Sequence, residues 1–109
     1  MQNTQLDQHG KLMSKIEVLA ILTKHREWLR TLGVNHAAVF GSVATGQNRA
    51  DSDVDILVEL IPARRTVFDL AGIENAVTDL IAGDVHVAIE DQLKPALRSS
   101  VLASAVYAF

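Results

Sequence analysis

The sequence predicts a small α/β domain in which helices pack over a mixed β-sheet of at least three strands. Three apolar segments of strand length, residues 34–40, 53–59 and 84–89, alternate with amphipathic segments of helix length. A chain of 109 residues, 49% hydrophobic and 21% charged, suffices for one hydrophobic core and not for two. We therefore expect one domain over residues 14–109, preceded by a loose polar arm over residues 1–13.

The first helix is predicted to begin after Ser14 and to run to about Leu32. Ser14 and Glu17 have the spacing of a capping box, and Gly33 is a suitable residue to end the helix. His25 falls in the middle of the apolar arc of the helical wheel, where we expect a buried neutral histidine and not a ligand. The members of this arc, which should face the sheet, are Val18, Ile21, Leu22, His25, Trp28, Leu29 and Leu32.

Two further helices are predicted in the second half of the chain. Thr66 can cap a helix over residues 67–82, and Gly83 is expected to end it. A C-terminal helix should cover residues 95–105, because Pro95 suits the first turn of a helix. The order of elements is then helix, strand, short helix or loop, strand, helix, strand, helix.

The junctions around the first two strands carry the residues best suited to binding or catalysis. Gly41 and Ser42 form a small-residue turn after the first strand, where backbone N–H groups can approach a phosphate closely. Asp53 and Asp55 begin the second strand, and residues two apart in a strand point to the same face. Two carboxylates on one face suit Mg²⁺ when substrate phosphates complete its ligand shell.

Composition excludes several other kinds of site. The chain has no cysteine, so it has neither disulfides nor thiolate metal sites, which agrees with the cytoplasmic location that we expect. The longest apolar runs are far shorter than the roughly 20 residues of a membrane-spanning helix, and the N-terminus has no signal-peptide core. A formal net charge of −3 argues against stable binding of nucleic acid.

The motif resembles that of the nucleotidyltransferase superfamily related to DNA polymerase beta, in its minimal (MNT) form. The similarity rests on Phe-Gly-Ser-Val-Ala at residues 40–44 and Ser-Asp-Val-Asp-Ile-Leu-Val at residues 52–58, with ten residues between Ser42 and Asp53. The resemblance covers residues ~14 to 109. The resemblance implies the small palm-like fold of this superfamily, with nucleotide at Gly41 and Ser42 and metal on Asp53 and Asp55.

One position departs from the family pattern. Similar proteins carry a third carboxylate on the next strand, and alignment on the Leu-Lys-Pro of residues 93–95 puts His86 in its place. Asp84, two residues earlier on the same strand face, can take over that role, or His86 can act as the general base. In a third alternative the site binds nucleotide and turns over poorly. As a direct ligand, His86 would favour Mn²⁺ or Zn²⁺ over Mg²⁺.

A second departure concerns the cation that touches the triphosphate in this family. Thr45 stands where similar proteins often have arginine. Arg49, Arg64 or Arg65 can supply the charge, although exposed loop arginines more often face solvent or a partner.

The resemblance implies an enzyme that transfers AMP from ATP to a hydroxyl group. Stand-alone domains of this kind commonly act as antitoxins, which adenylylate a tyrosine of a helical HEPN-type RNase toxin. The alternatives are a degenerate domain that neutralises its partner by binding alone, and transfer to a small molecule, for which no acceptor domain is present. Formation of a homo-oligomer stays open.

Overall fold

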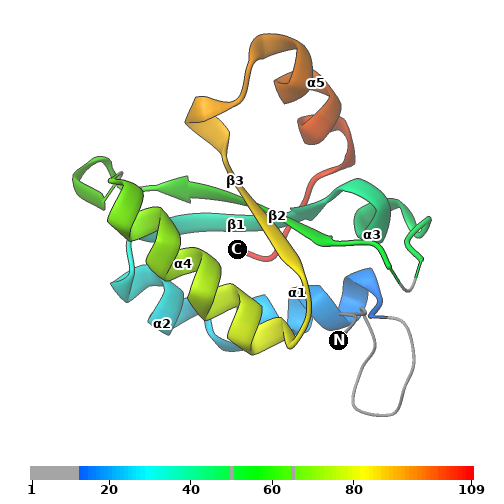
Figure 1. Cartoon of the computed structure of the whole chain (residues 1–109), viewed down its shortest axis with the longest axis horizontal. Coiled ribbons are helices and arrows are strands. Elements are labelled where there is room, and N and C mark those ends of the chain that lie inside the picture. The colour runs from blue at the N-terminus through cyan, green and yellow to red at the C-terminus, as the bar shows by residue number, and fades with distance from the viewer. Residues whose placement is uncertain (1–12, 50, 65) are drawn as a thin grey trace.

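The computed structural model describes residues 13–49, 51–64 and 66–109 and shows the mixed sheet that the sequence predicts (Figure 1). The strand order is β3-β2-β1-β4, with β1 antiparallel to β2 and to β4 and with β2 parallel to β3. The first three strands agree with the predicted segments to within one residue. The two-residue β4 was not expected, because so short a segment has no periodicity to detect. The strands are β1 (Val34–Phe40), β2 (Val54–Leu60), β3 (Val85–Ile89) and β4 (Val106–Tyr107).

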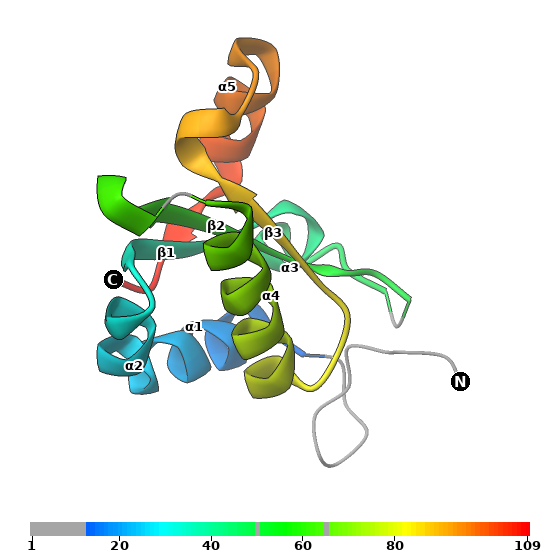
Figure 2. The same ribbon diagram turned by 60° about the vertical axis from the view of Figure 1, so that its left-hand side comes forward.

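Helices lie on both faces of this sheet. Figures 1 and 2 show α1, α2 and α4 under one face, while α5 projects from the other face and α3 follows β1. None of these helices is long and apolar enough to cross a membrane, as far as the described residues go. The helices are α1 (Lys15–Lys24), α2 (Arg26–Thr31), α3 (Gly41–Thr45), α4 (Val67–Ile81) and α5 (Pro95–Ser104), with 3₁₀ turns η1 (Pro62–Arg64) and η2 (Glu90–Gln92).

Strand alternation divides the apolar side chains between two clusters. The main cluster lies between the sheet and α1, α2 and α4, and it includes Val18, Leu22, Leu29, Val39, Ile56, Val58, Ile73, Val77, Val87 and Ile89. The second cluster, on the α5 side, consists of Ala38, Phe40, Leu57 and Ala88, with Leu93, Val101 and Ala105 packed against it. Asp55 and His86 are each two residues from a member of the second cluster, so their side chains belong to the α5 side of the sheet.

The prediction of one continuous first helix was wrong. Ser14 does cap α1, accepting a hydrogen bond from Glu17 N at 3.2 Å, but the helix breaks at His25, whose φ of −103° and ψ of 17° are not helical. Trp28, which was predicted to face the sheet, is 45% exposed, whereas the neighbouring Leu29 is buried. His25 is half-buried and meets the Trp28 ring edge-to-face, with 6.4 Å between the ring centroids.

The boundaries of the later helices agree better with the sequence. Thr66 caps α4 in a reciprocal capping box with Asp69, and Pro95 is the first residue of α5. The residue in left-handed conformation at the end of α4 is Ala82, with a φ of 58°, and not the predicted Gly83. Of the predicted N-terminal arm, only Met13 is among the described residues, and its side chain is buried in the main cluster.

Candidate active site

Gly41 turns the chain from β1 into α3 directly beside a carboxylate. Its φ is +70°, a value that side-chain-bearing residues rarely adopt. Because β1 and β2 pair Phe40 with Asp55, the next residue lies against the Asp55 side chain. A Cβ atom at position 41 would overlap Asp55 Oδ2 and stand 3.2 Å from Asp55 Cγ. The glycine is therefore required both for the turn and for the room that the carboxylate occupies.

The two aspartates stand at the start of β2, on the side of the sheet that carries α5. Asp53 immediately precedes the strand and is exposed, whereas Asp55 is its second residue and is half-buried, with 25% of its side chain accessible. The negative charge of Asp53 acts on Asp55, as expected for carboxylates that project from one face.

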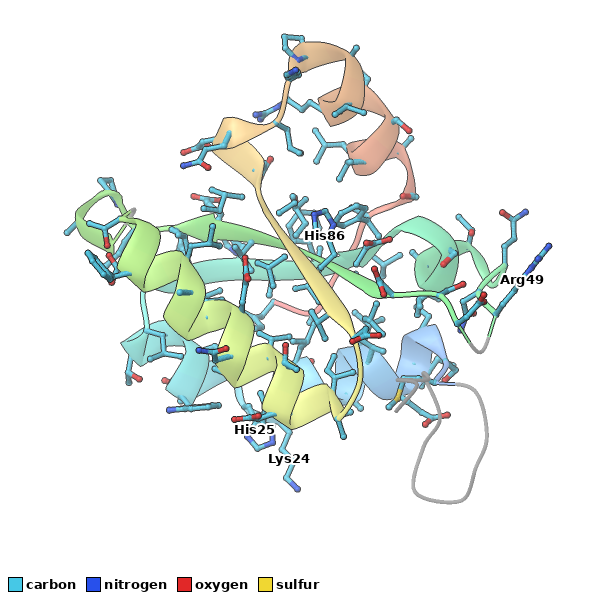
Figure 3. The ribbon with its side chains drawn as sticks, in the orientation of Figure 1. Lys24, His25, Arg49 and His86 are labelled. Atoms are coloured by element: carbon cyan, nitrogen blue, oxygen red, sulfur yellow. The ribbon has the colours of Figure 1, made fainter. Side chains whose placement is uncertain are left out.

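The neighbouring strand brings His86 to the same carboxylate. The parallel register of β2 and β3 pairs Asp55 with His86, and His86 Nδ1 lies 3.3 Å from Asp55 Oδ1. Figure 3 shows His86 on the side of the sheet towards α5. Asp84 lies just before β3, where its carbonyl accepts a hydrogen bond from Val54 N at 2.9 Å. Val54 pairs with Val85, so continuing the register by one residue sets Asp84 beside Asp53. Asp84 is therefore two residues along the strand from His86, which occupies the position opposite Asp55.

Burial dominates the electrostatics of Asp55. Loss of water around the carboxylate raises the pKa of Asp55 above the usual 3.8. The hydrogen bond and the charge of His86 act in the opposite direction and are smaller effects, while the charge of Asp53 adds to the rise. The carboxylate is therefore less stable as an anion than an exposed one, and a cation bound beside it would relieve this cost.

This raised pKa makes a prediction about stability. A group that binds its proton more tightly in the folded state contributes stability that is complete below its unfolded pKa of about 3.8 and is lost as pH rises through the higher folded value. We expect the free energy of unfolding of the wild type to fall, relative to that of Asp55→Asn, as pH rises above about 4.

Urea unfolding at several pH values measures this difference. Asp51→Asn, at an exposed position before β2, corrects for the loss of one negative charge. A difference that does not change with pH would contradict the prediction.

The two carboxylates fit a divalent cation whose remaining ligands come from a nucleotide. Carboxylate oxygens are ligands that Mg²⁺ prefers, and Asp53 and Asp55 bring two carboxylates to the start of β2. Within the described part of the chain, no group of three or more histidine, aspartate or glutamate side chains is placed to hold a metal ion. Asp53 and Asp55 would thus supply part of a coordination shell, and phosphate oxygens would supply the rest.

Of the arginines predicted to supply a charge here, Arg49 is the one whose side chain the structure describes, and it does not lie at this site. Thr45 Oγ1 hydrogen-bonds to the carbonyls of Gly41 and Ser42, at 3.3 Å each, and so closes the short α3. Arg49 points outwards from the loop after α3, away from His86 (Figure 3). Arg65 and the side chain of Arg64 lie outside the described residues.

One residue beside the site was missed at the sequence level. Ser104, the last residue of α5, accepts a hydrogen bond through Oγ from Gly41 N at 3.2 Å. The two residues are 63 positions apart, and a serine near a helix end gives no signal of such a contact. Only the return of the chain across the sheet brings them together.

Comparison with known proteins agrees with this geometry. A family model described as a nucleotidyltransferase domain matches residues 22–108. The protein adenylyltransferase MntA of Thermococcus cleftensis is 36% identical over 94 residues, covering 84% of this chain and 92% of that protein. A solved structure assigned as a minimal nucleotidyltransferase matches with a TM-score of 0.74 at 34% identity, over 86% of this chain and 95% of that one. An MNT antitoxin complex with a tri-AMPylated HEPN toxin of Shewanella oneidensis matches with a TM-score of 0.63 at 15% identity, over 84% of this chain and 71% of that one.

The last of these similarities, at its low identity, shows the fold alone. The family model spans most of the chain, and the likeness to MntA extends over nearly the whole length of both proteins. The turn at Gly41, Asp53 and Asp55 fall inside the matched region. The chain therefore belongs to the nucleotidyltransferase domain family, and its fold is that of a minimal nucleotidyltransferase.

Proposed function

We propose that this protein transfers AMP from ATP to a hydroxyl group of a partner protein with release of pyrophosphate, and that the partner is a HEPN-type toxin modified on tyrosine. The observation that carries the proposal is the half-buried Asp55 carboxylate, which lies between the Gly41 turn and His86 and follows Asp53. The name of the Thermococcus cleftensis relative supports adenylyl transfer, and the Shewanella oneidensis complex supports a HEPN toxin as acceptor. The proposal places both proteins in the cytoplasm.

In this proposal the chain binds and orients the triphosphate. The turn would hold phosphate oxygens through the Ser42 hydroxyl and the backbone N–H groups that follow Gly41, whose own N–H is donated to Ser104 Oγ. Asp53 and Asp55 would hold Mg²⁺, which when bound stabilises charge on the phosphate oxygens during in-line transfer. The half-buried position of Asp55 strengthens its attraction for a cation, because less water screens the charge.

His86 is the residue that we assign to the acceptor hydroxyl. A neutral His86 that donates its Nδ1 proton to Asp55 Oδ1 carries the lone pair on Nε2, and this nitrogen can accept a proton. The contact with Asp55 also fixes the tautomer and the orientation of the ring. With 63% of its side chain exposed, His86 is accessible to an acceptor on a partner. Asp84 is the alternative for this role.

Intact mass spectrometry tests the proposal. The partner protein is incubated with the chain, ATP and Mg²⁺, and a mass gain of one or more AMP units is expected. We expect His86→Ala to lower the rate of transfer by about 10²-fold or more, the usual contribution of a general base, and Asp84→Ala to have a smaller effect. The reverse order of the two variants would assign the role to Asp84.

A second candidate function is neutralisation by binding alone. The observation that favours it is the imidazole at position 86, where the family resemblance predicts a carboxylate, in contact with Asp55. In this case the wild type would form a stable complex with the partner and would add no mass to it. Replacement of His86 by Asp would then be the natural way to restore transfer.

A further inference from the structure

The C-terminal end of α5 is hydrogen-bonded to the turn on which the candidate site is built. Ser104 Oγ accepts from Gly41 N at 3.2 Å, and its own proton is directed to Val101 O at 3.3 Å. Both contacts are half-buried. The Ser104 hydroxyl thus donates its proton within α5 and accepts a hydrogen bond from the Gly41 turn. The two bonds together fix the orientation of the hydroxyl.

The N–H group of Gly41 needs a partner from elsewhere in the chain. It is the first N–H of α3, and the first N–H groups of a helix have no acceptor within that helix. Without the Ser104 hydroxyl, a partly buried donor would depend on water alone. The same glycine lies against Asp55 Oδ2, so a displacement of Gly41 would change the space around that oxygen.

Helix α5 is attached to the rest of the chain by few contacts. It has no buried residue, and it projects from the sheet on the side of Asp55 and His86 (Figures 1 and 2). Val101 and Ala105 pack against the second cluster, and Arg98 reaches the carbonyl and the carboxylate of Glu90 at 3.3 and 3.4 Å. Among the described contacts, the hydrogen bond from Gly41 N to Ser104 Oγ is the one that joins α5 to the Gly41 turn.

We propose that Ser104 is a positioning residue, whose hydroxyl holds the Gly41 turn in place against the Asp55 carboxylate. Through this bond the position of α5 sets the geometry of the carboxylate side of the site. The inference rests on the proposed function only in so far as Asp55 serves nucleotide binding and AMP transfer. The hydrogen bond itself can be tested without any transfer.

Three variants and three measurements test the proposal. Ser104→Ala removes the acceptor, Ser104→Thr keeps it, and Ser99→Ala makes the same substitution at an exposed position of the same helix. The measurements are hydrogen exchange of the Gly41 amide by NMR, the Kd for a fluorescent ATP analogue with Mg²⁺, and kcat and KM for AMP transfer. For Ser104→Ala we expect faster exchange at Gly41 and about 5-fold weaker nucleotide binding, the size typical of one hydrogen bond. Ser104→Thr, which keeps the hydroxyl, and Ser99→Ala should both show the exchange rate at Gly41 and the nucleotide affinity of the wild type.

Several outcomes would overturn the proposal. Unchanged exchange at Gly41 in Ser104→Ala would show that the bond does not protect the amide, and faster exchange with unchanged nucleotide binding would leave a structural role only. Tighter nucleotide binding would mean that Ser104 competes with the ligand. If Ser104→Ala does not fold, Ser104→Cys replaces it, since a thiol of similar size is a poor acceptor. A wild type that transfers no AMP would refute the proposed function, while the exchange and binding measurements would still decide the role of Ser104.

Discussion

Replacement of Asp53 or Asp55 by asparagine is expected to reduce AMP transfer by about 10³-fold or more. An amide has nearly the shape of the carboxylate but lacks the charge that holds a divalent cation against phosphate oxygens, and loss of such electrostatic stabilisation has effects of this size. Asp55 is half-buried and its pKa is raised, so the neutral amide should not destabilise the fold. We therefore expect folded and inactive variants.

The rate of mass gain on the partner protein measures this effect, and size-exclusion chromatography shows whether the complex still forms. Asp51→Asn is the matched control, because Asp51 is an exposed aspartate in the segment that precedes β2. This variant is expected to keep full activity. If both Asp53→Asn and Asp55→Asn transferred AMP at the wild-type rate, the carboxylates would have no part in the chemistry. If both variants still neutralised a toxic partner without transfer, binding alone would account for the function.

Replacement of Gly41 by alanine is expected to lower both stability and activity. The left-handed backbone at φ +70° disfavours any side chain, and the added Cβ would overlap Asp55 Oδ2. We expect a loss of about 3 kcal/mol in the free energy of unfolding, of which the backbone conformation supplies about 1 to 2 kcal/mol. Displacement of the Asp55 carboxylate should reduce AMP transfer by about 10²-fold in the fraction that remains folded.

Gly46→Ala separates the two contributions. Gly46 has nearly the same φ, +76°, but a Cβ there would have no atom within 4 Å. We expect about 1 kcal/mol of destabilisation and wild-type transfer for this variant. Urea unfolding and initial rates, measured on both variants, test the comparison. Equal losses of stability and activity in the two variants would show that the closeness of Gly41 to Asp55 has no consequence.

Elements whose boundaries depend on local chemistry could be predicted from the amino-acid sequence. The apolar run that ends at Phe40 predicts β1 as it is observed, and Thr66 as a capping residue predicts the start of α4. The fixed spacing from Gly41 to Asp53 and Asp55 is sufficient to identify the candidate site. These signals are readable because each depends on residues close together along the chain.

Features that depend on residues far apart come from the tertiary structure. The break at His25 and the pairing of β4 with β1 have no clear local signal. The choice between His86 and Asp84 as the neighbour of Asp55 is open in the sequence, because both lie on the same strand face. The parallel register of β2 and β3 sets His86 opposite Asp55, and the return of α5 to the turn brings Ser104 to Gly41. Strand register and helix packing are set by the whole core, so they cannot be read from a local segment.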